Sequence, residues 1–453
     1  MTNRNILNAM RFWASNSGQK PLVLRGARQV GKTTTVHEFG KEFNQYIYLN
    51  LEIKQDRIPF DEFENMDKLI ERIFFLKNKF YSKKEKTLIF IDEIQEVPEA
   101  MNLLRYFYEL YPEIYVIAAG SLLEILFDNQ HSFPVGRVEY MVLRPFTFIE
   151  FLRTINEEAA LQQYNTIPLN EFAHEKLMSL FRTFALIGGM PEIVKEYAKR
   201  KDLKALKPYY ESLIASYLDD VEKYAKNSTQ LQIIRHAIKS TLLEAGKRIK
   251  FQEFGNSNYG SREMGEALRT LEKAMLIQLI YPTVNTVLPI VLELKKSPRL
   301  HVLDTGLMNY YVGIQKEIIS TNDLHSVYEG HMIEHLVGQE IIANEHGALS
   351  GLNFWTREKK TSQAEVDYVV IHNSKLIPIE VKSGAVGKLK SLHLFMNDAN
   401  HNLAVRVYGG KLFISHIKTP LGKEFYLLNL PYLLSAQLTE YLDWFEDEVA
   451  KMK

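Results

Sequence analysis

The sequence predicts an α/β protein with a parallel sheet near the N-terminus, a helical middle segment and a second α/β unit at the C-terminus. Apolar runs alternate with amphipathic helical segments as far as Leu143. From Pro145 onward, apolar residues recur at the three- and four-residue spacing of helices. A helical segment that begins at Gly330 is followed by short strands. The 453 residues suffice for about three domains.

Composition narrows the classes of protein that the chain can form. Its 55 Lys and Arg residues balance 55 Asp and Glu residues, so binding to nucleic acid would need a local basic patch. The absence of cysteine excludes disulfides, cysteine-based zinc sites and cysteine nucleophiles. No apolar stretch reaches the roughly 18 residues of a membrane span, and the N-terminus lacks an apolar signal segment. We therefore expect a cytoplasmic protein with no membrane contact.

A glycine-rich loop follows the first predicted strand, Pro21–Leu24. The loop matches the P-loop pattern Gly-x4-Gly-Lys-[Ser/Thr], and an amphipathic helix follows it. Such a loop lets backbone amides surround phosphates, and the helix N-terminus adds a favourable dipole. We expect Lys32 to reach the β- and γ-phosphates of ATP and Thr33 to bind Mg²⁺. The predicted nucleotide-binding residues of the loop are Gly26, Ala27, Arg28, Gln29, Val30, Gly31, Lys32, Thr33 and Thr34.

A second apolar strand, Thr87–Ile94, carries the acids Asp92 and Glu93 near its end. A continuous apolar run is typical of a buried parallel strand, and ligands bind at the carboxyl ends of such strands. We expect Asp92 to hold Mg²⁺ through water and Glu93 to polarise the attacking water.

Three further strands, Tyr46–Leu51, Ile114–Ser121 and Arg137–Leu143, complete a predicted five-stranded sheet. Ser121 is either a sensor of the γ-phosphate or the N-cap of the next helix. Arg137 is either an arginine finger that acts across the boundary of a homo-oligomer or one partner of a salt bridge.

The middle segment contains a sharp turn, Gly188–Pro191, which we expect near the nucleotide. From Gln230 to Leu294 the order is three helices and then two strands, "IQLIYP" and "VLPIVLEL", which suits a winged helix. The third helix would expose the basic residues Arg262, Arg269 and Lys273. Acids on the same helix would repel phosphates, so DNA contact and a structural or partner role both remain open; these acids are Glu263, Glu266 and Glu272.

The C-terminal unit contains the hairpin "EVDYVVIHNSKLIPIEVKSG". A turn centred between Asn373 and Ser374 would place Asp367 opposite Glu380, with Lys382 on the same face as Glu380. Facing carboxylates repel unless a proton or a cation lies between them. Mg²⁺ prefers such oxygen ligands, although Lys382 alone could also neutralise the pair.

These residues, together with Glu334 on the preceding helix, resemble the acid–Asp–Glu-x-Lys signature of restriction-endonuclease-like nucleases. The resemblance implies that Glu334, Asp367 and Glu380 bind the metal that activates water. It also implies that Lys382 stabilises the charge that develops at phosphorus. Whether such a site cuts DNA or only binds it remains open. Elsewhere in this unit, we expect surface or capping roles for His331, His335 and His346 and a core position for Trp355.

Over nearly its whole length the chain resembles a family of prokaryotic AAA-type P-loop ATPases that carry a C-terminal domain of poorly defined function. The motifs that carry this resemblance are "GARQVGKTTT", "IFIDEIQ", "GRVEYMVLRPFTFIEFL", "ALIGGMPEIV" and "LHVLDTGLMNYYVG". The resemblance implies an ATPase core, a helical lid, a winged-helix segment and a restriction-endonuclease-like domain. We place these at residues 1–160, 161–227, 228–325 and 326–453.

The expected function is Mg²⁺-dependent ATP hydrolysis coupled to a DNA-binding, nuclease-like module. The alternative is an ATP-gated switch or scaffold whose nuclease-like domain is inactive and only binds. A third possibility is a machine that remodels a protein partner.

Overall fold

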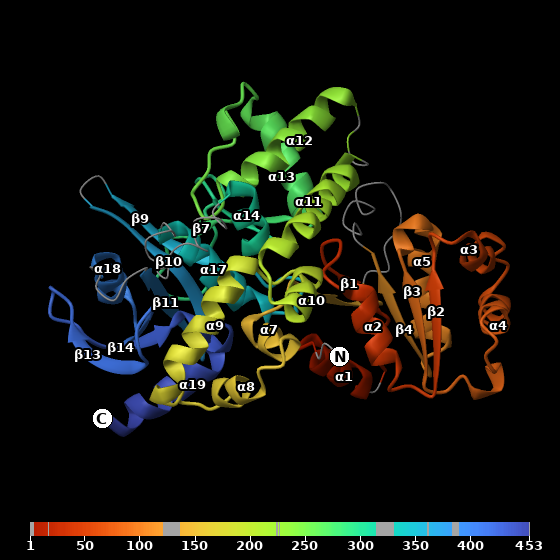
Figure 1. Ribbon diagram of the computed structural model, residues 1–453, viewed down its shortest axis with the longest axis horizontal. Helices are drawn as coiled ribbons and strands as arrows, with labels where there is room; N and C mark the ends of the chain where they lie inside the picture. Colours follow the sequence, from red (N-terminus) through yellow and green to blue (C-terminus); the bar gives the residue numbers. More distant parts are fainter. Residues whose placement is uncertain are drawn as a thin grey trace.

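The computed structural model describes residues 4–16, 18–120, 136–222, 225, 227–313, 330–359, 362–382 and 389–452. Figure 1 shows an N-terminal sheet at one end of the molecule, a C-terminal sheet at the other end and helices between them. Within these ranges, no helix combines the length and the apolar character needed to cross a membrane.

The N-terminal sheet confirms the predicted five parallel strands. Its order is β2-β3-β4-β1-β5, and every neighbouring pair is parallel. Because parallel strands end at one edge, the loop after β1 and the acid at the end of β3 meet there. The strands are β1 (Leu22–Arg25), β2 (Gln45–Asn50), β3 (Thr87–Asp92), β4 (Ile114–Ala119) and β5 (Glu139–Val142).

Helices cover both faces of this sheet. Leu22 and Leu24 of β1 pack with α1 (Ile6–Ser15) and α2 (Lys32–Gly40). Val23, which points the other way, packs in a second core cluster. That cluster contains residues of α3 (Lys54–Asp61), α4 (Met66–Leu76) and α5 (Pro98–Leu110). The alternation of a strand therefore produces three layers.

The segment after Phe146 is helical, as the spacing of its apolar residues predicts. Its helices are α7 (Phe148–Thr154), α8 (Glu158–Tyr164), α9 (His174–Ile187), α10 (Pro191–Arg200) and α11 (Lys207–Glu222). Thr147 begins α7 with a capping box, in which its side chain accepts from the Glu150 amide.

The turn between α9 and α10 is a junction of three segments. The Gly189 amide donates to Asp304 Oδ2 at 2.6 Å, and the Gly189 carbonyl accepts from the Phe146 amide at 2.7 Å. A Cβ atom on Gly189 would lie 2.2 Å from the carbonyl oxygen of Phe146. Only glycine leaves room for this approach.

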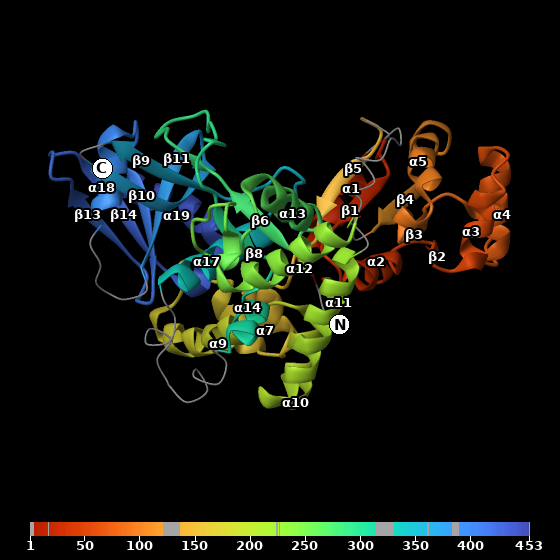
Figure 2. The ribbon, with the colours of Figure 1, turned by 90° about the horizontal axis from the view of Figure 1, so that it is seen from above.

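The next segment lies between the two sheets, as Figure 2 shows from above. It contains α12 (Ser228–Leu243), a 3₁₀ turn at Phe254–Asn256, α13 (Ser261–Lys273), β6 (Ile277–Ile280), β8 (Arg299–Val302) and α14 (Thr305–Val312). The apolar face of α13 is buried at Met264, Leu268 and Leu271, whereas Met275, just after the helix, is part-exposed.

The prediction that "VLPIVLEL" forms the second strand of the wing is wrong. β6 pairs antiparallel with β8, and "VLPIVLEL" contributes only an isolated bridge from Leu292 to Thr283. Pro289 interrupts this stretch, and a proline has no amide proton to give to a strand ladder. The true partner of β6 therefore lies further along the chain than the sequence pattern indicates.

The C-terminal unit is α/β, as predicted. Its seven-stranded sheet has the order β13-β14-β12-β11-β10-β9-β7. The strands are β7 (Pro282–Thr283), β9 (Asn353–Lys359), β10 (Ser362–His372), β11 (Lys375–Lys382), β12 (Leu403–Tyr408), β13 (Phe413–Lys418) and β14 (Glu424–Pro431). One face packs with α18 (Lys390–Asp398) and the buried Trp355, whose predicted core position is confirmed. The other face packs with α17 (Gly330–Ala343) and α19 (Leu438–Met452).

The hairpin of β10 and β11 has the predicted register. His372 pairs with Lys375, and Asn373 and Ser374 have φ of 45° and 61°, as a two-residue hairpin turn requires. The last residues paired in this ladder are Tyr368 and Ile379, so Asp367 and Glu380 lie one position beyond it.

Side chains do not alternate regularly between the two faces of the sheet in β10 near Asp367. Val366 pairs with Trp355 and Val369 with Asn353, so β10 has one extra residue against β9. Val366 and Val369 consequently pack in the same core cluster, against α18. Such a bulge re-aims side chains locally, and Asp367 lies within it.

Substitution of Gly189 tests the junction. We expect Gly189→Ala to lower the free energy of unfolding by about 1–3 kcal/mol, because the new methyl group meets the Phe146 carbonyl. Gly260→Ala is the control, since its Cβ would have its nearest neighbour at 3.7 Å. Urea unfolding followed by circular dichroism measures both, and equal midpoints would contradict the assignment.

Candidate functional site

The P-loop wraps around the ammonium group of its own lysine. Lys32 Nζ donates to the carbonyls of Gly26 at 2.8 Å and Ala27 at 3.0 Å. Gln29 and Gly31 adopt left-handed φ values of 65° and 95°, which turn the backbone into the start of α2. Burial lowers the pKa of Lys32 to about 8, while the nearby carboxylates of Glu93 and Asp92 oppose this shift.

The end of β3 meets the start of α2, as predicted. Thr33 Oγ1 donates to Asp92 Oδ2 at 2.8 Å, and the Tyr48 hydroxyl donates to the same oxygen at 3.3 Å. Burial raises the pKa of Asp92, and the Thr33 hydrogen bond opposes the rise. A hydroxyl and a carboxylate form the oxygen donor set that Mg²⁺ prefers, so these residues fit a metal that accompanies a nucleotide.

Glu93 lies beside this pair in a constrained conformation. Its φ of 50° and ψ of 46° are left-handed, which is uncommon for a residue other than glycine. Gln95 Nε2 donates to Glu93 Oε2 at 2.5 Å and orients its carboxylate.

Helix α11 lies against the P-loop through contacts that the sequence analysis missed. Arg28 Nη1 is 2.8 Å from Asp220 Oδ1, and the Tyr217 hydroxyl donates to the Arg28 carbonyl at 3.0 Å. Gln29 Nε2 donates to Ser216 Oγ at 3.3 Å. No local pattern indicates these contacts, because they join residues that are 187 to 192 positions apart in the sequence.

Arg4 is a second residue that the sequence analysis missed. It is 6% exposed, and it donates to the Val30 carbonyl at 3.0 Å and to Glu150 Oε1 at 2.9 Å. Next to it lies a cavity of about 540 Å³, lined by residues that include Arg4, Gly31, Thr34, Thr35, Pro191 and Lys195. This space adjoins the N-terminus of α2, beside the P-loop.

Arg137 is placed away from the P-loop of its own chain. It precedes β5, so it lies at the amino ends of the strands, opposite the edge that carries the loop. Its side chain is half exposed, and Nε is 2.8 Å from Glu109 Oε1. The salt-bridge alternative describes this arrangement. The other candidate from this part of the sheet, Ser121, lies outside the described residues.

The C-terminal acids and Lys382 come together, as predicted. Asp367 Oδ2 accepts from the Val381 amide at 2.7 Å, and Lys382 Nζ donates to Glu380 Oε1 at 2.5 Å. Glu380 is 5% exposed, and its Oε2 has no hydrogen-bond partner among the described residues. We call Glu334, Glu365, Asp367 and Glu380 the acidic cluster.

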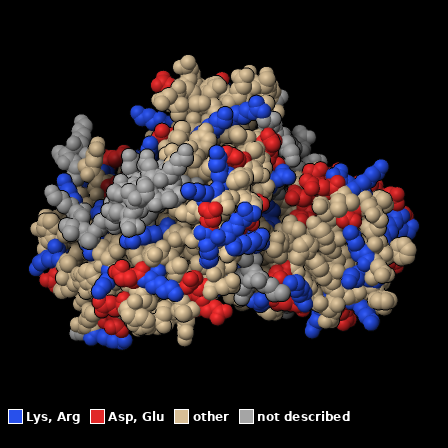
Figure 3. Space-filling view, viewed as in Figure 1, with Lys and Arg blue, Asp and Glu red and all other residues tan. Residues whose placement is uncertain are grey.

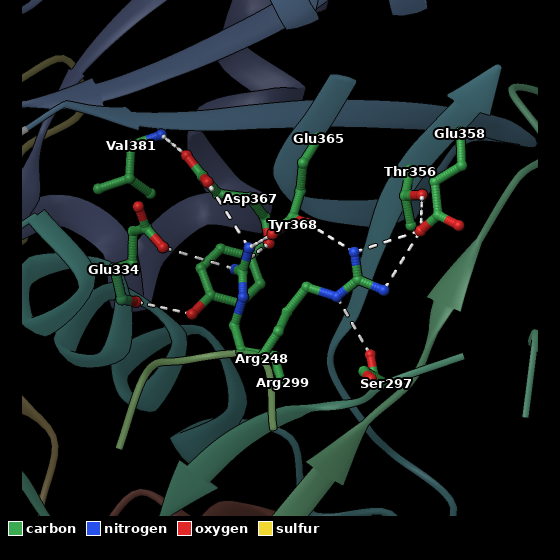
Figure 4. Close-up of polar contacts among 10 residues, drawn as sticks. All are labelled: Arg248, Ser297, Arg299, Glu334, Thr356, Glu358, Glu365, Asp367, Tyr368 and Val381. Carbon is green, nitrogen blue, oxygen red and sulfur yellow. Dashed lines mark hydrogen bonds and ion pairs between the residues drawn. The ribbon is translucent and has the colours of Figure 1, made fainter. Parts of the chain in front are cut away.

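A guanidinium group lies in this cluster (Figure 4). Arg299 of β8 is 3% exposed, and its nitrogens are 3.8 Å from both Glu334 Oε2 and Asp367 Oδ1. It also pairs with Glu365 and donates to the Asp367 carbonyl at 2.8 Å. The signal in the sequence was a single arginine at the start of an apolar strand, because a buried charge needs a partner.

The expected metal-binding geometry is not present in this arrangement. Among the described residues, no three His, Asp or Glu side chains are placed to hold a metal ion together. Burial raises the pKa of Glu334 and Glu380, and the charge of Asp367 raises both further. Arg299 opposes the rise at Glu334, whereas Lys382, ahead of Arg299, opposes it at Glu380, so these two cations share the neutralising role expected of a metal.

Other predicted surface residues have mixed outcomes. On α13, Arg262 and Arg269 are exposed and Lys273 is part-exposed. The expected surface role of His335 is wrong, because its buried ring stacks on His301 and its Nε2 accepts from the Val302 amide at 3.0 Å. His346 is part-buried, and the side chain of His331 lies outside the described residues.

Three family models match successive parts of the chain. An AAA domain matches residues 18–152, which contain the P-loop and all five strands of the N-terminal sheet. Two domains of unknown function, DUF8612 and DUF4143, match residues 178–318 and 329–431. The search of curated proteins found no match. The AAA part of the expected architecture is therefore supported over residues 18–152, whereas neither the winged helix nor the restriction-endonuclease-like domain is confirmed.

Solved structures with similarity to the chain are distant. A Walker-type ATPase of Pyrococcus abyssi is 16% identical, with a TM-score of 0.45, over 69% of this chain and 96% of that one. The ORC1 protein of Aeropyrum pernix, solved with DNA, is 12% identical, with a TM-score of 0.29, over 70% and 92%. The Thermotoga maritima RuvB branch migration motor is 16% identical, with a TM-score of 0.28, over 63% and 88%.

The lowered pKa of Lys32 gives a test of its place in the site. Phosphates would keep Lys32 protonated in the complex, whereas the free protein loses this proton above pH 8. ATP affinity should therefore stay level up to that pH and then fall, by at most about tenfold per pH unit. Calorimetric titrations in buffers of different ionisation enthalpy would show proton uptake appearing over the same range. Constant affinity and no uptake up to about pH 9.5 would contradict the assignment.

Proposed function

We propose that the protein binds ATP and hydrolyses it with Mg²⁺. The observation that carries this proposal is the contact of Thr33 with Asp92 beside the Lys32 loop, within a segment that matches an AAA domain. In the proposed complex Lys32 leaves the carbonyls of its own loop and binds phosphate oxygens. The cavity beside Arg4 offers space for the rest of the nucleotide.

The metal would be held by Thr33 and Asp92, and when bound it neutralises phosphate charge. Glu93 orients the attacking water and accepts its proton, and Gln95 holds the Glu93 carboxylate in position. The backbone amides of the loop and the helix N-terminus stabilise charge on the phosphates.

The lid would report the nucleotide state. Asp220 is paired with Arg28, so incoming phosphates compete with this carboxylate for the same guanidinium. Loss of that pair would weaken the contact of the P-loop with α11, whose neighbours include α12 and α14. A second connection runs through the turn at Gly188–Pro191. There the Gly189 amide donates to Asp304, which lies two residues after the end of β8. ATP binding would thereby change the position of the segment between the two sheets.

DNA is the second part of the proposal. The chain has no net charge, but an exposed basic run extends from the end of α10 to the start of α11. Figure 3 shows basic side chains gathered in the middle of the face that it draws. The exposed residues of the run are Lys199, Arg200, Lys201, Lys204 and Lys207. Such a run fits a phosphate backbone. The meeting of Asp367, Glu380 and Lys382 supports a nuclease-like site.

The alternative is an ATP-gated switch or scaffold whose C-terminal unit only binds. The guanidinium of Arg299 within the acidic cluster favours this alternative for the arrangement described above. In a homo-oligomer, Arg137 would have to leave its ion pair with Glu109 to reach the P-loop of a neighbouring subunit. A cytoplasmic location agrees with a chain that has no cysteine.

Two substitutions separate ATP binding from hydrolysis. We expect Lys32→Ala to weaken ATP binding at least about tenfold, because it removes a charge-assisted contact with the phosphates. We expect Glu93→Gln to keep binding and to lower kcat about 10²- to 10⁴-fold. Lys41→Ala, at the exposed end of the same helix, is the matched control. Calorimetry and phosphate release measure the two effects, and unchanged hydrolysis by Lys32→Ala would contradict the proposal.

A cleavage assay separates the nuclease-like function from the switch. With ATP and Mg²⁺ or Mn²⁺, we expect Asp367→Ala and Lys382→Ala to abolish DNA cleavage and to leave ATP hydrolysis unchanged. Glu424→Ala, an exposed acid on β14, serves as the control. If the wild-type protein cuts no DNA under any of these conditions, the switch becomes the better account.

A further inference from the structure

Two arginines of the middle segment, which are distant in sequence but lie side by side, contact the C-terminal unit. Arg248 and Arg299 form an antiparallel bridge with each other. Arg248 contacts Glu358 at 3.3 Å and Glu365 at 3.5 Å, and its side chain is 30% exposed. Arg299 lies deeper and is 3% exposed. The pair therefore has an outer, partly solvated member and an inner, desolvated one. Figure 4 shows both arginines with their carboxylate partners.

The contacts of Arg299 lie almost entirely in the C-terminal unit. Its guanidinium is 4.8 Å from the ring centre of Phe354 and 5.7 Å from that of Tyr368. Its carboxylate partners come from α17 and β10. The Tyr368 hydroxyl donates to the Glu334 carbonyl at 2.7 Å, which ties α17 to the same place. A side chain of the middle segment thus supplies the charge of an acidic cluster built by another unit.

The other side of the cluster is incompletely satisfied. Glu380 is 5% exposed and has one oxygen on Lys382, while its second oxygen has no hydrogen-bond partner among the described residues. A buried carboxylate oxygen without a partner is costly. This oxygen would be a ligand for a cation beside Asp367 if Arg299 left the cluster.

We propose that Arg299 occupies the cation position of the acidic cluster, so that a divalent metal binds there only after β8 has carried this side chain away. A guanidinium and a metal ion compete for the same carboxylate oxygens, and their positive charges repel one another when both lie beside these oxygens. Mg²⁺ also needs near-octahedral coordination with room for several waters, which the inserted side chain takes up. The cluster is closed to metal while the middle segment stays docked.

This inference concerns the nuclease-like part of the proposed function and does not depend on ATP hydrolysis. β8 ends at Val302, and Asp304, two residues later, accepts from Gly189 in the lid turn. The same segment that supplies Arg299 therefore contacts the lid. A shift of the lid is transmitted to β8 by this hydrogen bond.

Manganese binding by the full chain without nucleotide tests the proposal, with unbound Mn²⁺ followed by electron paramagnetic resonance. We expect Arg299→Gln to gain a Mn²⁺ site at least about tenfold tighter than any of the wild-type protein. Arg299→Gln combined with Asp367→Asn should lose that site. Arg248→Gln removes the same charge from the neighbouring position and should gain none. Thermal unfolding and ATP binding establish that each variant is folded.

Folded Arg299→Gln protein with no gain in Mn²⁺ binding would overturn the proposal. A second arm needs no change at Arg299. If the cluster is closed, Asp367→Asn in the wild-type background leaves the Mn²⁺ titration unchanged. A wild-type Mn²⁺ site that disappears in Asp367→Asn would show that the cluster is open with Arg299 in place, and the proposal would fail. ATP hydrolysis by the same samples reports separately on the nucleotide site.

Discussion

A buried charge needs hydrogen bonds or a charge of opposite sign to offset its lost hydration, and in this protein several charged partners come from distant segments of the chain. Arg4 pairs with Glu150, Arg28 with Asp220, and Arg299 with Glu334 and Asp367. Each pair joins two elements that the backbone does not connect directly. Removal of one partner leaves an uncompensated charge in a desolvated place, so the segments hold one another in register.

These pairs lie along the route from the nucleotide site to the C-terminal unit. The P-loop contacts α11 through Arg28, and the lid turn contacts Asp304 through Gly189. Asp304 is fully buried, and burial raises its pKa to about 6 while backbone amides oppose the shift. Its hydrogen bonds to Gly189 and Leu307 join the lid to α14. The P-loop and the segment that carries β8 are therefore linked by contacts of a few named side chains.

Much of the N-terminal fold could be predicted because its signals are local. Thr87–Asp92 is apolar throughout, and the P-loop pattern is contiguous, so neither requires knowledge of distant partners. The register of the β10–β11 hairpin followed from the two residues of its turn. The prediction of the second wing strand was wrong because β6 pairs with Arg299–Val302 across a long loop, and no local pattern in the sequence indicates this pairing. The bulge at Asp367 and the insertion of Arg299 depend on tertiary contacts and were missed for the same reason.

Movement of the lid on ATP binding is the central claim, and a distance measurement tests it most directly. The chain has no cysteine, so spin labels can be attached at introduced cysteines. Ser82→Cys places one label just before β3 of the N-terminal sheet, and Ser212→Cys places the other on α11; both positions are exposed. Double electron–electron resonance should show a shifted distance distribution when ATP and Mg²⁺ are added, and no shift when Lys32→Ala is also present. Identical distributions with and without nucleotide, in protein that binds ATP, would contradict the account.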